Sequence, residues 1–211
     1  MLRSAEPVDP APQTDPDAVA VDGQPLAPRL AVQRGMFSGP SPLVPEGLYA
    51  EVLRGNARRE RHQVQLTPGT RVSTNTYWGR LHATYWQRWT AVPEVRVELR
   101  ATGRGRIWLM ASDTNKVGRA VDAVTVDSGA GDIGTVLLTG KIDRFVDGGG
   151  MWLELTTDTG EMTVSEVVWS VAHPEPVRPT SITICTYNRV EDCLNTLQAL
   201  LCLLYTSDAA D

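Results

Sequence analysis

Apolar and polar residues alternate with a period of two from residue 64 to about residue 172. In the stretch VRVELR, for example, Val95, Val97 and Leu99 alternate with charged residues. Such alternation is typical of strands with one buried face, and the short strands here are bounded by Gly, Pro or Asp. We therefore predict a mainly β domain over residues 46–173, an antiparallel β-sandwich of jelly-roll type without any helix of useful length.

Two hairpins are predicted inside this domain. Gly103 and Gly105 would reverse the chain between VRVEL and RIWLM, and residues 158–160 supply turn chemistry between MWLEL and a second strand through Val164 and Val168. Further short strands are predicted in QLTPGTRVS, DAVTV and GTVLLTGKID. The spacing of these strands favours a sandwich built from neighbouring strands.

The N-terminal segment differs from this domain in composition. Nine of the 14 prolines fall within residues 7–45, and residues 1–22 carry five acidic side chains against the single base Arg3. Little apolar surface is then available to offset chain entropy, so residues 1–45 are predicted to be disordered. The net charge of -5 argues against a nucleic-acid-binding protein, because neutralising phosphates needs a surplus of Lys and Arg.

The sequence also bears on the cellular compartment. The N-terminus lacks the apolar segment of a secretory signal, and the longest apolar stretch, LQALLCLLY, is too short to span a bilayer. The three cysteines, Cys185, Cys193 and Cys202, have spacings that fit neither a zinc site nor a disulfide framework. We therefore expect a cytoplasmic protein whose cysteines are reduced.

A basic run lies within this acidic chain. Arg54, Arg58, Arg59 and Arg61 are concentrated in the stretch LYAEVLRGNARRERHQ. We interpret the run as a solvated connector, in preference to a contact with anionic lipid or with a diphosphate.

Aromatic residues cluster in ATYWQRWT, where Tyr85, Trp86 and Trp89 occupy five positions. Aromatic faces can stack on sugar rings, so a carbohydrate platform is one interpretation. Aromatic residues of a small sandwich more often pack in the core or at an interface, and we favour packing.

A different pattern begins after the proline-rich linker at residues 174–180. Over residues 181–201 a short strand in SITIC is followed by a turn and a helix with one apolar stripe, for which Asn188 is the predicted N-cap and Glu191 the capping-box carboxylate. In open α/β sheets ligands bind beyond the carboxyl ends of the strands, which makes Thr186, Tyr187, Asn188 and Arg189 candidate binding residues. An ordinary turn between strand and helix is the equally simple alternative.

An ordered set of stretches carries a family resemblance. They are LY at 48–49, NARR at 56–59, YWQRWT at 85–90, TGRGRI at 102–107, DGGGMWLELTTDT at 147–159 and TYNR at 186–189. ITICTYNR resembles the first strand and loop of the inverting GT-A glycosyltransferases of family two. The preceding domain is similar to the N-terminal β-sandwich of actinobacterial galactofuranosyltransferases that polymerise cell-wall galactan.

The resemblance implies substrates, a cofactor and a location. The donor would be UDP-galactofuranose and the acceptor a polyprenyl-diphosphate-linked galactan, with divalent Mn²⁺ or Mg²⁺ clamping the UDP diphosphate. Thr186, Tyr187, Asn188 and Arg189 would bind the UDP part of the donor. The resemblance further implies a homo-oligomer, peripherally associated with the inner face of the plasma membrane.

Members of the resembled family carry an acidic metal motif and a catalytic carboxylate beyond the region matched here. We therefore expect this chain to be an N-terminal fragment without catalytic residues or metal ligands, inactive alone, whose residues 202–211 are a non-native tail resembling translated adapter sequence. The alternative is a stand-alone β-sandwich that binds glycan or protein, with a vestigial C-terminal tail.

Overall fold

The computed structural model describes residues 29–41, 43–112, 117–129, 133–143, 145, 149–172, 184 and 187–208, and from residue 201 the main chain alone. The chain divides into two units, residues 1–175 and residues 176–211. The first unit contains every described strand, and the second contains a single described helix.

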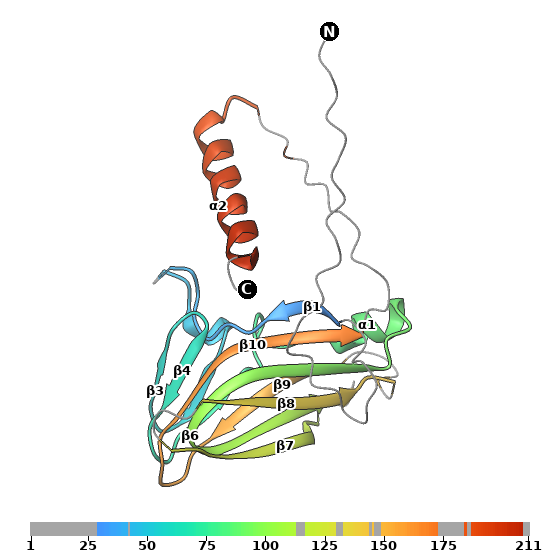
Figure 1. The fold of residues 1–211 in the computed structure, drawn as a ribbon. Helices are drawn as coiled ribbons and strands as arrows, with labels where there is room; N and C mark the ends of the chain where they lie inside the picture. The colour runs from blue at the N-terminus through green and yellow to red at the C-terminus, as the bar shows by residue number, and fades with distance from the viewer. Residues whose placement is uncertain are drawn as a thin grey trace. The chain divides into compact units, whose positions relative to one another are not determined.

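One long strand, β6 (Glu94–Ser112), belongs to two sheets at once (Figure 1). Its first half lies between β8 (Gly134–Lys141) and β10 (Met162–Ala172). Its second half lies between β7 (Arg119–Asp127) and β9 (Gly150–Thr156). Every one of these pairings is antiparallel, so the strand is the common member that joins the two sheets.

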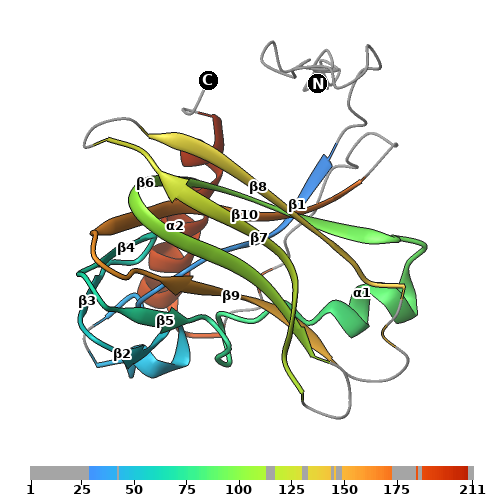
Figure 2. The ribbon, with the colours of Figure 1, turned by 90° about the horizontal axis from the view of Figure 1, so that it is seen from below.

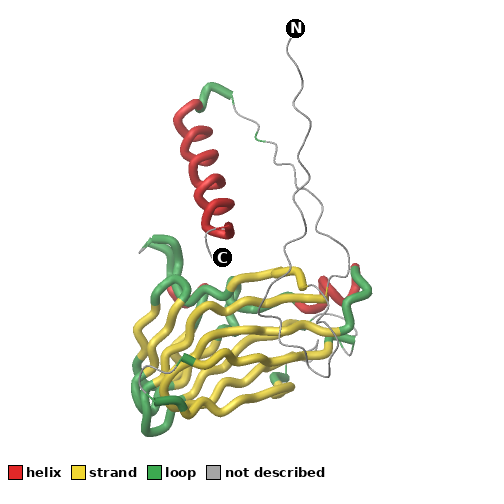
Figure 3. The backbone as a smooth tube through the Cα atoms, in the orientation of Figure 1, coloured by secondary structure: helices red, strands yellow, loops and turns green. Residues whose placement is uncertain are grey.

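The first sheet continues on the far side of β10. There β1 (Arg29–Arg34) pairs with the C-terminal part of β10, and β4 (Gln63–Leu66) pairs with its N-terminal part. β3 (Ala57–Arg59) pairs with β4 at the edge. The long strands of this sheet curve together, as the tube view shows (Figure 3).

The second sheet continues on the far side of β9. There β5 (Arg71–Ser73) pairs with β9, and β2 (Glu51–Arg54) pairs with β5. The order of this sheet is therefore β2, β5, β9, β6 and β7, and Figure 2 shows these strands together. The described strands confirm the predicted mainly antiparallel β fold.

The hydrophobic core forms from the alternate residues that the strands turn away from solvent. Ile107 and Leu109 of β6 and Leu153 and Leu155 of β9 are all at most 1% exposed, and Trp169 of β10 joins them in one buried cluster. Because successive strand residues point to opposite faces, the residues between them remain available at the surface.

The hairpin predicted at Gly103 is wrong, because β6 runs straight through this glycine. Gly103 has a φ of +98°, and a Cβ added there would lie 2.1 Å from the carbonyl oxygen of Glu161. Glycine at this position therefore allows the backbone of β6 to approach a neighbouring segment closely. The approach occurs where β6 passes from one sheet to the other.

The second predicted hairpin has the right strands but the wrong pairing. β9 and β10 are both present, and residues 158–160 bend the chain between them. However, β9 pairs with the second half of β6, and β10 pairs with the first half. Alternation specifies which face of a strand is buried, but it does not specify the neighbouring strand.

The sandwich begins earlier in the chain than predicted. β1 and the 1%-exposed Phe37 lie within the segment 1–45 for which we predicted disorder. Leu30 and Val32 pack against the core, which gives this stretch apolar surface to bury despite the surrounding prolines. The prediction is therefore wrong for these residues, and residues 1–28 lie outside the described part of the chain.

A short helix interrupts the strands where none was expected. α1 (Ala83–Trp89) covers most of the aromatic cluster, and a 3-10 turn spans Glu46–Leu48. Trp86 packs against the core, whereas Tyr85 and Trp89 are 59% and 70% exposed. The packing interpretation thus holds for one of the three aromatic residues.

The second unit contains α2 (Val190–Asp208), with Glu191 and Asp192 in its first turn. The predicted helix is therefore present and continues past the expected boundary at residue 201. Residues 174–180 and the strand predicted in SITIC, except Ile184, lie outside the described residues. No helix in the described part of the chain is long and apolar enough to cross a membrane.

Candidate functional site

Three of the four predicted donor-binding residues lie in the described loop that leads into α2. Tyr187 is 93% exposed, and Asn188 has a φ of +51°, in the left-handed region. Nη1 of Arg189 lies 3.3 Å from Oδ2 of Asp192, and both side chains are largely exposed. The fourth residue, Thr186, lies outside the described residues. The loop thus presents an aromatic ring and a guanidinium next to the first turn of a helix.

The start of α2 differs from the prediction by one residue. The backbone N–H of Cys193 donates to the carbonyl oxygen of Arg189 at 3.0 Å. The residue whose carbonyl accepts the first helical bond is the N-cap, so Arg189 occupies this position and the prediction of Asn188 is wrong. The left-handed conformation of Asn188, which Asn tolerates better than most residues, turns the chain into the helix. The Cys193 thiol is free.

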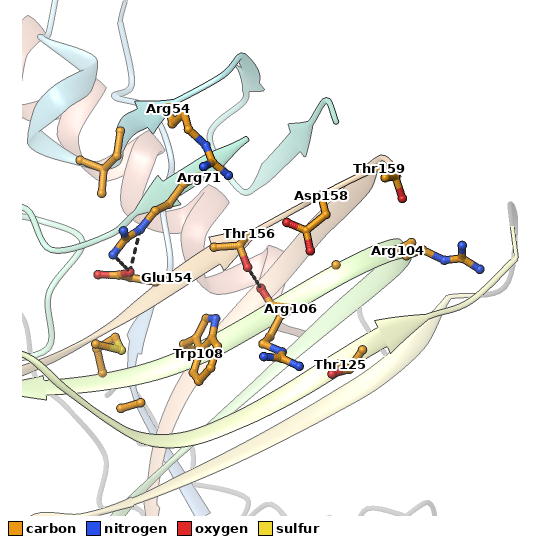
Figure 4. A pocket seen from close by; sticks show the side chains of 14 residues that line it. Arg54, Arg71, Arg104, Arg106, Trp108, Thr125, Glu154, Thr156, Asp158 and Thr159 are labelled. Atoms are coloured by element: carbon orange, nitrogen blue, oxygen red, sulfur yellow. Dashed lines mark hydrogen bonds and ion pairs between the residues drawn. The ribbon is translucent and has the colours of Figure 1, made fainter. Parts of the chain in front are cut away.

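A second candidate site lies on the surface of the second sheet, on the face opposite the core. We call it the sheet groove, a cavity of about 890 Å³ lined by residues of β2, β5, β9, β6 and β7. Its charged and aromatic lining includes Arg54, Arg71, Arg104, Arg106, Trp108 and Glu154 (Figure 4). The volume falls in the range of about 300–1,000 Å³ that is typical of small-molecule sites.

The arginines that line the sheet groove have partners of different kinds. Nε of Arg71 donates to Oε2 of Glu154 at 3.0 Å, and a second guanidinium nitrogen contacts the same oxygen. Nε of Arg104 donates to Oδ1 of Asp127 at 3.0 Å. Nε of Arg54 donates to the carbonyl oxygen of Gly69, also at 3.0 Å. The groove is therefore rich in donors without being a bare cationic surface.

The aromatic residue of the groove also contacts an arginine. The guanidinium carbon of Arg106 lies 5.0 Å from the ring centroid of Trp108. A cation over an aromatic face is attracted by the ring quadrupole, and this contact restrains both side chains. The hydroxyl of Thr156 on β9 donates to the carbonyl oxygen of Arg106 at 3.3 Å, beside the two side chains (Figure 4).

The basic run divides between several locations. Arg54 lies in β2 and lines the groove, while Arg58 and Arg59 lie in β3. Arg59 forms an ion pair with Glu46 and donates to the carbonyl oxygen of Ala50 at 2.8 Å. The connector interpretation is therefore wrong for these three residues, because they belong to strands.

The sheet groove was not predicted from the sequence, although a signal was present. Arg104, Arg106 and Trp108 occupy alternate positions of β6, so they share its outer face. The sequence alone predicts a turn at Gly103 and Gly105. The residues after a turn begin a new strand, so the shared face of Arg104, Arg106 and Trp108 was not recognised. Glu154 and Arg71 could not be placed beside them without the strand pairing.

No group of three or more His, Cys, Asp or Glu residues that could hold a metal ion occurs within the described ranges. The resemblance places the metal motif beyond the region matched in this chain, so the divalent ion stays a prediction for the full-length enzyme.

Comparison with known proteins assigns the sandwich to a family. The family model described as Galactofuranosyltransferase 2 N-terminal matches residues 46–172. The chain is 33% identical over 166 residues to galactofuranosyltransferase GlfT2 of Mycolicibacterium smegmatis, covering 75% of this chain and 25% of that protein. It is 30% identical over 164 residues to GlfT2 of Mycobacterium tuberculosis, covering 75% of this chain and 26% of the relative.

Among solved structures, a carbohydrate binding module of family 29 matches with a TM-score of 0.40 and 10% identity, covering 68% of this chain and 88% of that one. The chain spans about a quarter of the length of the curated relatives it matches. Because the family model covers more than half of the chain and agrees with both relatives, the chain belongs to the galactofuranosyltransferase 2 family and contains its N-terminal domain.

Proposed function

We propose that this chain supplies the N-terminal domain and the first donor-binding loop of an enzyme that transfers galactofuranose from UDP-galactofuranose to a growing galactan. The observation that carries the proposal is the family match over residues 46–172, together with relatives that are named galactofuranosyltransferases. Because the match covers only about a quarter of those relatives, the activity is proposed for a protein of their length and not for this domain alone.

The finer parts of the proposal concern acceptor and location. We take the acceptor to be a galactan linked to polyprenyl diphosphate, extended by a homo-oligomer in the cytoplasm that associates peripherally with the membrane. A lipid-linked acceptor supports this location, since the enzyme must reach a chain anchored at the membrane surface. Family membership supports the transferase class, and these substrate details extend it.

Within the loop, Arg189 is the residue we assign to the UDP diphosphate. A guanidinium offers forked donors that suit phosphate oxygens. The ion pair between Arg189 and Asp192 lies between side chains that are 77% and 69% exposed. Exposed pairs of this kind contribute little stability, so a diphosphate could replace the carboxylate at small cost. Tyr187, 93% exposed in the same loop, is assigned to the uracil, and Thr186 and Asn188 complete the proposed contacts.

The divalent Mn²⁺ or Mg²⁺ ion belongs to the proposal for the whole enzyme. When bound, such an ion neutralises charge on the departing diphosphate. None of the described residues of this chain is assigned to hold it.

A chimera tests the proposed function. Residues 46–200 would replace the equivalent stretch of the M. smegmatis relative, and transfer from UDP-galactofuranose to a synthetic galactan acceptor would be followed by mass spectrometry. We expect transfer by the chimera. Loss of a charge-assisted hydrogen bond of about 1.5–3 kcal/mol in Arg189→Ala should raise the KM for the donor roughly 10- to 150-fold and leave the KM for the acceptor unchanged.

Two further variants separate binding from a structural role. Arg189→Lys keeps the positive charge but loses the forked N–H donors of the guanidinium. It should therefore retain only part of the donor affinity that Arg189→Ala loses. Asp192→Asn removes the partner of Arg189 in the ion pair, and it should leave the donor KM unchanged or lower it. If Asp192→Asn weakens donor use as much as Arg189→Ala does, Arg189 acts by holding the helix start. A folded chimera that transfers no galactofuranose would overturn the proposed function.

A further inference from the structure

The sheet groove has a structure that none of the galactofuranosyl-transfer chemistry above requires. It lies on the outer face of the sandwich, on strands that bury their other face in the core. We propose that the sheet groove is a binding site for a neutral oligosaccharide. The identity of the oligosaccharide, a galactofuranose chain, rests on the proposed function. The existence of a binding site is argued from the residues of the groove alone.

The distribution of donors and acceptors carries the inference. Arg71 lies on one side of β9 and Arg104 and Arg106 lie on the other, while Glu154 and Thr156 project from β9 between them (Figure 4). Sugar hydroxyls both donate and accept hydrogen bonds, so a surface that alternates donors with acceptors matches them. This alternation extends across the width of the groove.

The carboxylates among the arginines favour a neutral ligand over an anionic one. Two carboxylates, Glu154 and Asp158, line the groove and would repel a phosphate. Arg71 is paired with Glu154 and Arg104 with Asp127, while Arg54 bonds to the carbonyl oxygen of Gly69 and Arg106 contacts Trp108. A neutral polyol can bind without breaking these pairs, whereas a diphosphate would have to compete with them.

Trp108 supplies the apolar part of the site. The ring is partly exposed within the groove, and Arg106 lies over it. The C–H faces of sugars pack on aromatic rings, and small-molecule sites typically combine such a surface with a few polar groups that fix orientation. Trp108 and Arg106 together form a mixed surface of this kind near the middle of the sheet.

The groove is held in place before any ligand binds. The side chain of Glu154 is only 13% exposed and accepts hydrogen bonds from Arg71. Its Oε1 also accepts a hydrogen bond from the indole N–H of Trp152, with 3.4 Å between the nitrogen and the oxygen. These contacts fix the orientation of the Arg71 guanidinium. Sites built on paired strands hold their side chains more accurately than sites on loops, so little ordering is needed on binding.

Calorimetric titration of the 211-residue chain with a neutral β-galactofuranosyl hexasaccharide tests the proposal. Neutral hexasaccharides of galactopyranose, glucose and mannose, and inorganic diphosphate, complete the panel of probes. We expect saturable binding of a neutral hexasaccharide. Trp108→Ala should weaken it roughly fivefold to tenfold, and Arg104→Ala about tenfold or more.

Matched controls are available on the same chain. Arg100 lies on β6, as Arg104 does. Arg100 forms an ion pair with Glu166 at 2.9 Å, and Arg104 forms one with Asp127 at 3.0 Å. Arg100→Ala should therefore leave binding unchanged, as should Trp89→Ala, which removes an exposed Trp outside the groove. Circular dichroism and the unfolding midpoint of each variant establish that it folds.

Each outcome decides the proposal. It falls if no neutral hexasaccharide binds, if both groove variants bind like the unmodified chain, or if diphosphate displaces the sugar. Binding of a pyranose chain but not the furanose chain would support the groove and contradict the proposed acceptor. Transfer by the chimera without oligosaccharide binding here would leave the proposed function standing and remove the groove from it.

Discussion

The β-sandwich and α2 contain the same apolar residue types, but the two regions bury them very differently. Leu109 in the sandwich is 0% exposed, whereas Leu194 and Leu197 on α2 are 58% and 43% exposed. Val190, at the first position of α2, is 69% exposed. Leucines and valines therefore stabilise structure only where a second element buries them. The periodicity of apolar residues in the sequence does not show which element that is.

The different burial of apolar residues in α2 and in the sandwich should affect the stability of each region. A lone helix of this length is marginal in water, because most helical stability in proteins comes from packing of the apolar face. The strands of the sandwich, in contrast, share one core to which both halves of β6 contribute. The two regions should therefore differ in local stability within the same polypeptide.

The largest expected effect is in amide hydrogen exchange. Core amides of β6, β9 and β10 should exchange only on global opening, which costs about 5–15 kcal/mol in domains of this kind. Amides of α2 should exchange several orders of magnitude faster, since Val190, Leu194 and Leu197 are largely exposed. Exchange followed by mass spectrometry on the whole chain measures the difference. Equal protection in α2 and the sandwich would contradict the comparison.

A pair of leucine substitutions should give the next largest effect. Leu109→Ala leaves a cavity in a closely packed core and should lower the free energy of unfolding of the sandwich by about 2–5 kcal/mol. Leu197→Ala, the same change on α2, should shift it by less than about 0.5 kcal/mol. Guanidinium unfolding followed by tryptophan fluorescence measures both. A similar midpoint for the two variants would show that α2 stabilises the sandwich.

A glycine pair sharpens the comparison within the sandwich. Gly103→Ala must adopt a φ of +98° and place its Cβ against the Glu161 carbonyl, so we expect a loss of about 2–4 kcal/mol. At Gly129 an added Cβ meets nothing within 4 Å, and Gly129→Ala should be neutral. Thermal unfolding of the two variants provides the measurement. If Gly103→Ala unfolds at the same temperature as the unmodified chain, the close approach of β6 to the Glu161 carbonyl is not needed for stability.

The sequence predicted the class of the fold because alternation is a local property of each strand. Val95, Val97 and Leu99 show their buried face within one short stretch. Strand pairing was predicted less well, since β9 and β10 follow one another in the chain and yet join different halves of β6. Neighbours in space depend on the whole core, which no single stretch encodes.

The candidate sites were predictable to different degrees. Tyr187, Asn188 and Arg189 form a contiguous motif, so their common loop followed directly from the sequence. The sheet groove joins Arg71 of β5 to Glu154 of β9, residues far apart in the chain. Such a site becomes visible only once the strand register is known.

Because both sheets depend on β6, the order in which the chain is made matters for how it folds. β1, the first described strand, can pair only after β10 has been synthesised. Arg29 of β1 donates a hydrogen bond to Ser170 of β10, 141 positions further on. Pairings over such separations fold slowly, because the loop-closure entropy must be overcome before any contact is gained. While β9 and β10 are still being synthesised, both edges of β6 lack those partners, and this strand is where we expect the nascent chain to be most prone to aggregation.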